Sequence, residues 1–185
     1  MSQSVFFPII ETPRLFIRPI HESDEGEIFK LYSSPTVMQY TDNKLLESLP
    51  ESLAFIRENN LLQQNGQMIW CGIAIKGAAE LCGTIRLYHF DGVHQFASLG
   101  CLLAEELWNK GVMTEALAAF CRQSFERLTL NRIEAQIFTG NAASVRLFNK
   151  LNFTFEGVLR ENFLIKGKFE NSALFSILKS DIIGL

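Results

Sequence analysis

Hydrophobic and polar positions change their spacing along the chain, and this spacing divides it into short strands and helices. Apolar β-branched runs bounded by turn residues predict strands, whereas apolar positions at helical spacing predict helices. The strands are predicted at residues 14–18, 68–75, 81–90, 97–103, 132–138, 153–163 and 173–178. The helices are predicted at residues 23–33, 48–65, 113–128 and 142–151.

Serine residues mark the predicted starts of the first two helices. Ser23 is expected to cap the first helix, and Ser48 followed by Pro50 is expected to start the second. The apolar positions expected on the inner face of the first helix are Ile28, Leu31 and Tyr32, and the second helix carries Leu53, Phe55, Ile56 and Leu61.

The order of these elements, βααβββαβαββ, predicts a mixed α/β (α+β) fold around one sheet. Strands joined by short turns pair antiparallel, whereas the strand, helix and strand of residues 97–138 form a parallel βαβ unit. The chain has 185 residues and no internal repeat or linker-like segment, so we expect one domain over residues 1–185.

Composition narrows the classes of function. Hydrophobic residues make up 48% and charged residues 20% of the chain, which is a globular and not a disordered composition. The formal net charge is -3, so no broad basic surface for nucleic acid is expected. A local basic pocket remains compatible with this charge.

The spacing of the four cysteines indicates the redox state of the compartment in which the protein works. Each lies inside an apolar run and none is spaced as CxxC, so we expect buried, reduced thiols in a cytoplasmic protein. They are Cys71, Cys82, Cys101 and Cys121. Residues 1–10 are too short and too poor in positive charge for a signal peptide, and no apolar run reaches membrane-spanning length.

A short loop joins the strand at 97–103 to the following helix, and its residues suit an anion. The loop carries Lys110 and Gly111 and has no acidic residue between Trp108 and Thr114. A helix start has backbone N–H groups without internal partners, and the helix dipole adds positive potential there. The alternative is a tight turn with a solvated lysine. The stretch lacks the glycine and lysine spacing of a P-loop and of a dinucleotide fingerprint.

A second helix starts at the end of the neighbouring parallel strand. Asn141 is a natural N-cap, and Ser144 lies about one turn further on. Ligands of open sheets bind outside the carboxyl ends of parallel strands, and both loops are expected at that edge. Two helix starts together favour a binding site over a simple turn.

Several stretches of the chain resemble one known family. Residues 108–117, WNKGVMTEAL, and 131–161, NRIEAQIFTGNAASVRLFNKLNFTFEGVLRE, closely resemble the GNAT superfamily of N-acetyltransferases. The nearest branch is that of the RimJ/RimL-like ribosomal-protein N-terminal alanine and serine acetyltransferases. Residues 11–40 resemble the first strand and helix of that branch, and residues 167–178 resemble its last strand. The resemblance spans nearly the whole chain and implies the GNAT fold.

The resemblance implies acetyl-CoA as the acetyl donor. It implies that the pantetheine arm runs along a strand that diverges from the next one, and that the pyrophosphate lies on backbone N–H groups after that strand. The residues expected to bind the cofactor are Cys101, Leu102, Leu103, Asn109, Lys110, Gly111, Val112, Met113, Thr114, Asn141, Ser144, Phe148 and Lys150. The histidines do not cluster with the cysteines, so no metal is expected.

The chain departs from the family pattern at five positions. In the loop these are Trp108, Asn109 and Met113, which a site built from main-chain N–H groups tolerates. Asn152 replaces a glycine after a helix end, where a positive φ is expected. Asn171 replaces a common aspartate, which affects acceptor recognition if that aspartate binds the acceptor.

The expected chemistry is acetyl transfer to a neutral amine. By its match to the N-x-x-S helix of the family, Ser144 is a candidate to protonate the leaving thiolate, and its alternative role is to bond back to its own turn. Glu134 is the first candidate for the general base, with His89, Glu161 and a water-mediated base as alternatives. Trp70 and Tyr88 are candidates for an acceptor pocket or for the core.

The predicted function is therefore an acetyl-CoA-dependent N-acetyltransferase acting on an amine. An α-amine has a reference pKa near 8 against about 10.4 for lysine, which makes its free base far more available at neutral pH. This favours a protein N-terminus as acceptor. Small-molecule acetylation, of a polyamine, amino sugar or amino acid, and non-catalytic CoA binding are the alternatives. The chain is expected to be a monomer or a homodimer and to bind neither nucleic acid nor membrane.

Overall fold

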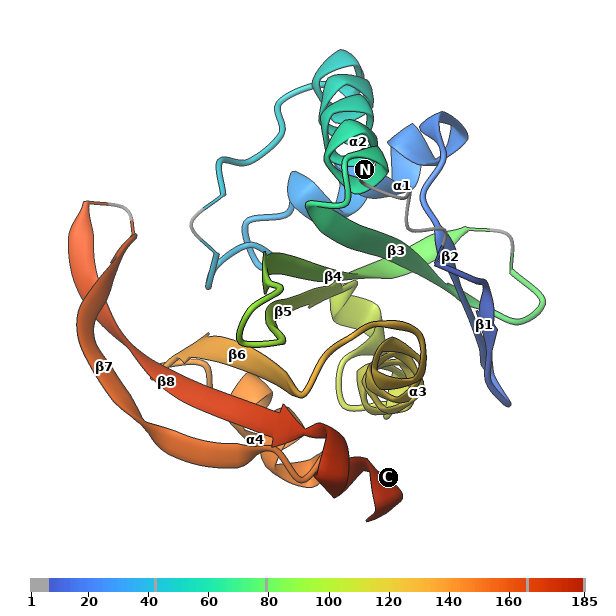
Figure 1. Ribbon diagram of the computed structural model, residues 1–185. Coiled ribbons are helices and arrows are strands. Elements are labelled where there is room, and N and C mark those ends of the chain that lie inside the picture. The colour runs from blue at the N-terminus through green and yellow to red at the C-terminus, as the bar shows by residue number, and fades with distance from the viewer. Residues whose placement is uncertain (1–6, 42, 79, 166, 185) are drawn as a thin grey trace.

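A computed structural model describes residues 7–41, 43–78, 80–165 and 167–184 of the chain, which alternate between strands and helices (Figure 1). Three short 3-10 helices, η1 to η3, complete the elements. In chain order these are β1 (Ile10–Glu11), β2 (Leu15–Pro19), η1 (Glu22–Asp24), α1 (Glu25–Tyr32), α2 (Leu49–Gln64), β3 (Met68–Ile75), β4 (Leu81–Asp91), β5 (Phe96–Leu103), η2 (Glu105–Leu107), α3 (Val112–Arg127), β6 (Arg132–Phe138), α4 (Ala142–Lys150), β7 (Thr154–Ile165), β8 (Lys168–Leu178) and η3 (Lys179–Gly184).

The strands form one 8-stranded sheet in the order β1-β2-β3-β4-β5-β6-β8-β7. Every neighbouring pair is antiparallel except β5 and β6, which are parallel and joined through α3. The predicted mixed sheet with one parallel βαβ unit is confirmed. A parallel pair needs a long crossover, and α3 with its preceding loop supplies it.

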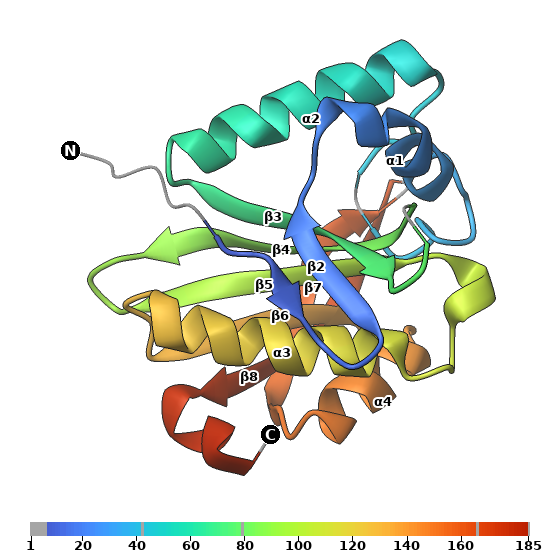
Figure 2. The ribbon, with the colours of Figure 1, turned by 90° about the vertical axis from the view of Figure 1, so that its right-hand side faces the viewer.

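The helices form a layer on each face of the sheet. The helices α1 and α2 cover one face over β3 and β4, whereas α3 and α4 lie on the opposite face (Figures 1 and 2). The strand β3 is buried on both sides: Ile69, Cys71 and Ile73 pack in the core with α3, and Met68 and Trp70 pack with α1 and α2. This explains why β3 is an almost continuous apolar run instead of an alternating one.

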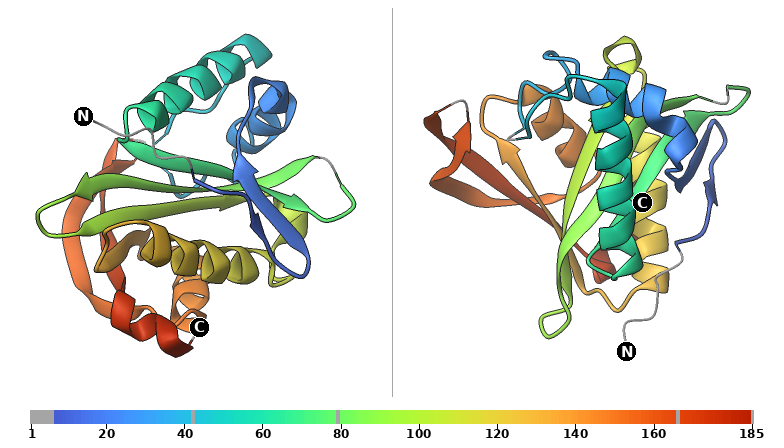
Figure 3. Two further views of the ribbon diagram at one scale, coloured as in Figure 1. Left: turned by 45° about the vertical axis from the view of Figure 1, so that its right-hand side comes forward. Right: turned by 90° about the horizontal axis from the view of Figure 1, so that it is seen from above.

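The last two strands curl away from the rest of the sheet, so neither helix of the α1 and α2 layer covers them (Figures 1 and 3). The strand β7 is irregular: its register with β8 shifts between Phe155 and Gly157 and again between Leu159 and Phe163. Bulges of this kind bend a strand and increase its twist. As a result, α1 and α2 do not cover the faces of β6 and β8 opposite α3 and α4, which we call the open face.

Most predicted elements are confirmed to within a few residues, and the differences have physical reasons. The Ser23 cap is wrong, because Glu22–Asp24 forms a 3-10 turn in which the Asp24 carboxylate accepts the N–H of His21 (2.8 Å). Leu61 of α2 is exposed. In α2 the buried positions include the polar Ser52 and Asn59, which bond to backbone carbonyls of Glu25 (2.8 Å) and Phe55 (2.7 Å).

The sequence prediction missed the two-residue strand β1 and the 3-10 helices η2 and η3. The predicted cap of the second helix is confirmed, because Ser48 accepts the N–H of Glu51. Within the described residues, no helix is long and apolar enough to cross a membrane.

Truncation of Phe120 is expected to destabilise the protein strongly. This side chain of α3 is fully buried and its ring lies 5.1 Å from that of Phe7. A buried Phe→Ala change costs about 3–5 kcal/mol of unfolding free energy, and urea unfolding of Phe120→Ala measures it. Phe169→Ala is the matched control, because Phe169 is 61% exposed. Its cost is expected to stay within about 0.5 kcal/mol, and equal costs would contradict this description of the core.

Candidate active site

The parallel strands β5 and β6 pair over only three positions and then diverge. Their partners are Phe96 with Arg132, Ala97 with Ile133 and Ser98 with Glu134. Beyond Ser98, β5 remains paired with β4 as far as Leu103. Residues 99–103 therefore present an unpaired strand edge toward β6, whose backbone groups are free to bind an extended polar ligand. The predicted divergence of the strands is present here.

The loop after β5 is fastened by its own residues. The indole N–H of Trp108 donates to the carbonyl of Leu103 (2.8 Å). Asn109 and Gly111 both adopt left-handed backbone conformations, with φ of 60° and 73°. These two turns bring the chain from the strand into α3, and Gly111 becomes the N-cap residue of that helix. A β-branched residue at either position would be strained.

The first turn of α3 has backbone donors without a capping side chain. No side chain caps this helix, and its first internal hydrogen bond runs from the N–H of Glu115 to the carbonyl of Gly111 (3.1 Å). The N–H groups of residues 112–114 are thus available to an anion. The side chains of Val112 and Met113 are buried in the core, so these residues can contact a ligand only through the backbone. Lys110 is exposed and adds a positive charge at the same end.

The neighbouring helix α4 has a cap of its own. The Oδ1 of Asn141 accepts the N–H of Ser144 (3.0 Å), which confirms Asn141 as the N-cap. Its side-chain oxygen therefore points at its own helix. The Ser144 side chain is half-buried, and among the described residues its hydroxyl has no hydrogen-bond partner. Among the described residues, the Ser144 hydroxyl therefore does not bond back to a carbonyl of its own turn, which was the alternative role.

The other predicted cofactor residues differ in what they expose. Cys101 and Leu102 are half-buried on opposite faces of β5, and Leu103 is buried. The Phe148 ring lies in the core, 4.9 Å from the ring of Phe153, so it supports α4 from within. Lys150 is exposed in the last turn of α4.

Glu134 lies on the open face of the sheet and is held by Arg132. The guanidinium contacts one oxygen of Glu134 (Nη2–Oε2 3.0 Å) and both oxygens of Glu156 (2.6 and 2.7 Å). Ser176 donates a further hydrogen bond to Glu156 (2.6 Å). The bonds from Arg132, followed by the one from Ser176, lower the pKa of Glu156 from 4.5 to about 2. Sequence analysis missed Arg132, Glu156 and Ser176, because this cluster exists only where three strands meet.

The alternative candidates for the general base, His89 and Glu161, do not belong to the Arg132 cluster. His89 and Glu161 were expected at strand ends, but both are exposed residues within strands, at irregular positions with φ of 51° and 49°. The Oδ1 of Asn171 accepts the N–H of Glu161 (2.8 Å). Because an aspartate oxygen would accept the same bond, this position supports the β7 bulge whichever of the two residues occupies it.

The two candidate aromatic residues for the acceptor pocket are separated by the structure. Trp70 is fully buried and contacts the Phe55 ring edge-on at 5.5 Å, so it belongs to the core under α2. Tyr88 is half-buried on the same face as Ser98 and carries the Arg86 guanidinium 4.8 Å from its ring centre. Only Tyr88 remains a candidate to contact an acceptor.

The cysteines are free thiols, as predicted, and two of them are fully buried. Burial raises the pKa of Cys71, Cys101 and Cys121 to about 12 and that of Cys82 to about 11. All four are protonated at neutral pH and are poor nucleophiles. No group of three or more potential metal ligands is found among the described residues.

A pocket of about 400 Å³ lies on the other side of η2, between α1 and the β3–β4 turn. Its lining stops at Leu107 and includes no residue of β6 or α4. It is therefore separate from the edge where β5 and β6 diverge.

Comparison with known proteins agrees with this geometry. Residues 14–154 match the model of a family described as acetyltransferase (GNAT) domain. The chain is 34% identical to the uncharacterized N-acetyltransferase YoaA of Bacillus subtilis (strain 168), covering 94% of this chain and 98% of that protein. It is 23% identical to the spermidine N(1)-acetyltransferase of Escherichia coli (strain K12), covering 88% and 85%.

The fold also matches a solved structure of RimL, a ribosomal L7/L12 alpha-N-protein acetyltransferase in complex with coenzyme A. The TM-score is 0.86 at 21% sequence identity, covering 94% of this chain and 99% of that chain. This likeness confirms the predicted fold.

Protonation of Glu156 is expected to destabilise the protein at low pH. The folded-state pKa of about 2 lies below the ordinary value of 4.5. The contribution of Glu156 to stability is therefore complete above pH 4.5 and is lost as the pH falls toward 2. The melting midpoint of Glu156→Gln should fall less steeply over this range than that of the wild type. Glu58→Gln, on the exposed face of α2, is the control and should follow the wild type.

Proposed function

Because the chain belongs to the GNAT family of acetyltransferases, we propose that it transfers the acetyl group of acetyl-CoA to the α-amine of a protein N-terminus. The one observation that carries the proposal is the uncapped start of α3 beside the diverging ends of β5 and β6. This combination supplies main-chain donors for a pyrophosphate and a free strand edge for an amide-bearing arm. The residues present thus fit the cofactor.

The described contacts support a division of roles among the predicted residues. The N–H groups of residues 112–114 hold the pyrophosphate, and the exposed Lys110 adds charge. Acetyl-CoA supplies an activated thioester. A backbone N–H near Leu102 is our candidate donor to the thioester oxygen. The unengaged hydroxyl of Ser144, at the start of α4, is suited to donate a proton to the leaving thiolate.

Glu134 is our candidate for the general base. Its position next to Ser98 places it where β5 and β6 separate, on the open face of the sheet. Arg132 binds only its Oε2, so among the described residues Oε1 has no partner and is available to an amine or to a bridging water. Any base must lie within hydrogen-bond reach of the amine, directly or through one water.

The open face of the sheet favours a peptide as acceptor. The helices α1 and α2 cover β3 and β4 but leave the outer strands uncovered (Figure 1). An extended peptide fits an open surface, whereas a small cation is better held in an enclosed acidic pocket. The lower pKa of an α-amine favours the same acceptor. The four free cysteines support a reducing, cytoplasmic setting. We further propose that residues 1–185 form one domain.

A small-molecule amine is the second candidate acceptor. It is supported by the similarity to a spermidine N(1)-acetyltransferase, which covers 88% of this chain. The two candidates differ in the amine that reacts, not in the cofactor site.

Cofactor binding and acceptor choice are expected to be measurable in two steps. Acetyl-CoA and CoA should raise the melting midpoint by several degrees at about 100 times their Kd, whereas ATP should not. Thiol release should then be faster with a short peptide bearing a free N-terminus than with the same peptide N-acetylated or with spermidine. Faster release with spermidine would select the second candidate. If CoA binds but no amine is acetylated, the protein is a non-catalytic CoA-binding module.

Ser144→Ala is expected to lower kcat while leaving the CoA-induced midpoint shift unchanged. Loss of a general acid lowers the rate by about 100-fold or more. Ser180→Ala, an exposed serine in η3, is the control and should retain wild-type kcat. An unchanged kcat in Ser144→Ala would remove Ser144 from the mechanism.

A further inference from the structure

An acidic residue lies in the first turn of α3, where the proposed function needs an anion to bind. Glu115 is one residue past the N–H groups of residues 112–114. A carboxylate at this place is stabilised when it lies over the free N–H groups of its own helix. It would then fill the anion site and repel a phosphate.

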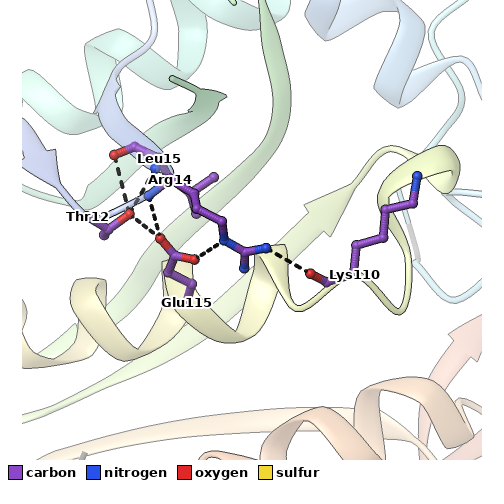
Figure 4. Close-up of polar contacts among 5 residues, drawn as sticks. All are labelled: Thr12, Arg14, Leu15, Lys110 and Glu115. Carbon is purple, nitrogen blue, oxygen red and sulfur yellow. Dashed lines mark hydrogen bonds and ion pairs between the residues drawn. The ribbon is translucent and has the colours of Figure 1, made fainter. Parts of the chain in front are cut away.

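The connection between β1 and β2 holds this carboxylate elsewhere (Figure 4). The Oε1 of Glu115 accepts bonds from the hydroxyl of Thr12 (2.6 Å) and the N–H of Arg14 (2.9 Å). Its Oε2 pairs with the Nε of Arg14 (2.5 Å). Burial alone would raise the pKa of Glu115, but these bonds outweigh it and lower the pKa. Both carboxylate oxygens are therefore engaged away from the start of α3.

The same arginine also contacts the loop before α3. The Nη1 of Arg14 donates to the carbonyl of Lys110 (3.1 Å), while the Lys110 side chain extends away from this contact (Figure 4). Arg14 is itself anchored, since its carbonyl accepts the N–H of Lys76 in the turn after β3 (2.8 Å). A strand distant in sequence thus fixes the backbone that leads into the helix.

We infer that Arg14, supported by Thr12, is a positioning residue of the cofactor site. It neutralises Glu115, keeps that carboxylate off the N–H groups of residues 112–114, and holds the Lys110 carbonyl in place. Without it, an uncompensated negative charge would lie in the first turn of α3. This inference rests on the proposed function, because the affected ligand is the CoA pyrophosphate.

The test measures the Kd of CoA by calorimetry for the wild type and four variants. Arg14→Ala should weaken CoA binding about tenfold, because an uncompensated negative charge near the helix start repels the pyrophosphate. Arg14→Lys keeps the charge but loses the planar contacts to both partners, so it should lie between Arg14→Ala and the wild type. In assays, the KM for acetyl-CoA should rise while the KM for the acceptor stays at the wild-type value.

A double variant separates positioning from a purely structural role. Adding Glu115→Gln to Arg14→Ala removes the uncompensated charge and should restore most of the CoA affinity. If Arg14 only stabilised the fold, removing its partner as well would restore nothing, and that result would overturn the inference. High salt should shrink the Arg14→Ala effect, because it screens the repulsion between Glu115 and phosphate.

Arg57→Ala is the matched control. Arg57 also binds a glutamate, Glu22, through two nitrogens (3.1 and 2.8 Å), and it is similarly exposed, at 60% against 51% for Arg14. It should leave the Kd of CoA unchanged, and the melting midpoints of all the variants without ligand show that each one folds. Equal Kd values for Arg14→Ala and Arg57→Ala would overturn the inference. Absence of CoA binding by the wild type would instead overturn the proposed function.

Discussion

The short parallel pairing between β5 and β6 is the constraint on which the site depends. The two strands are tied together at Ser98 and Glu134 and separate beyond that point. Since both strands run in the same direction, the helices that follow them, α3 and α4, start at the same edge of the sheet. The short parallel pairing therefore leaves a free strand edge beside Glu134, at the edge of the sheet where both helices start.

The cofactor site is built from backbone, which explains how it accommodates unusual residues. Trp108 ties the loop to the end of β5, Asn109 adopts the left-handed conformation that this residue type tolerates, and Met113 points into the core. None of the three removes a main-chain donor. The same loop depends on contacts from a different part of the chain. Arg14, directly before β2, binds the carbonyl of Lys110 and the carboxylate of Glu115.

The open face shows how strand pairing assembles polar clusters. Arg132, Glu134, Glu156 and Ser176 come from three strands, and their contacts form because β8 lies between β6 and β7. Asn171 has a comparable role on the outer edge, where it accepts a backbone N–H at the bulge in β7. The replacement of a common aspartate by Asn171 leaves that hydrogen bond intact, so the change in charge at this position need not alter the fold.

Local signals in the sequence determined most of the elements. The apolar periods, the Ser48 and Asn141 caps and the positive φ at Asn152 (59°) all follow from interactions within a few residues of one another. Ser23 failed as a cap because the carboxylate of the adjacent Asp24, which is bound to Arg18, accepts the backbone N–H of His21 instead.

The sequence by itself thus determined most of the elements, their order, the family and the two helix starts that form the candidate site. Only the tertiary structure decided where β5 and β6 separate and that Trp70 and Phe148 belong to the core. It also decided that Arg132 holds Glu134 and that Arg14 holds Glu115. The physical reason is distance along the chain. Caps and periodicity act between near neighbours, whereas tertiary packing brings together residues such as Arg14 and Glu115 that no local pattern connects.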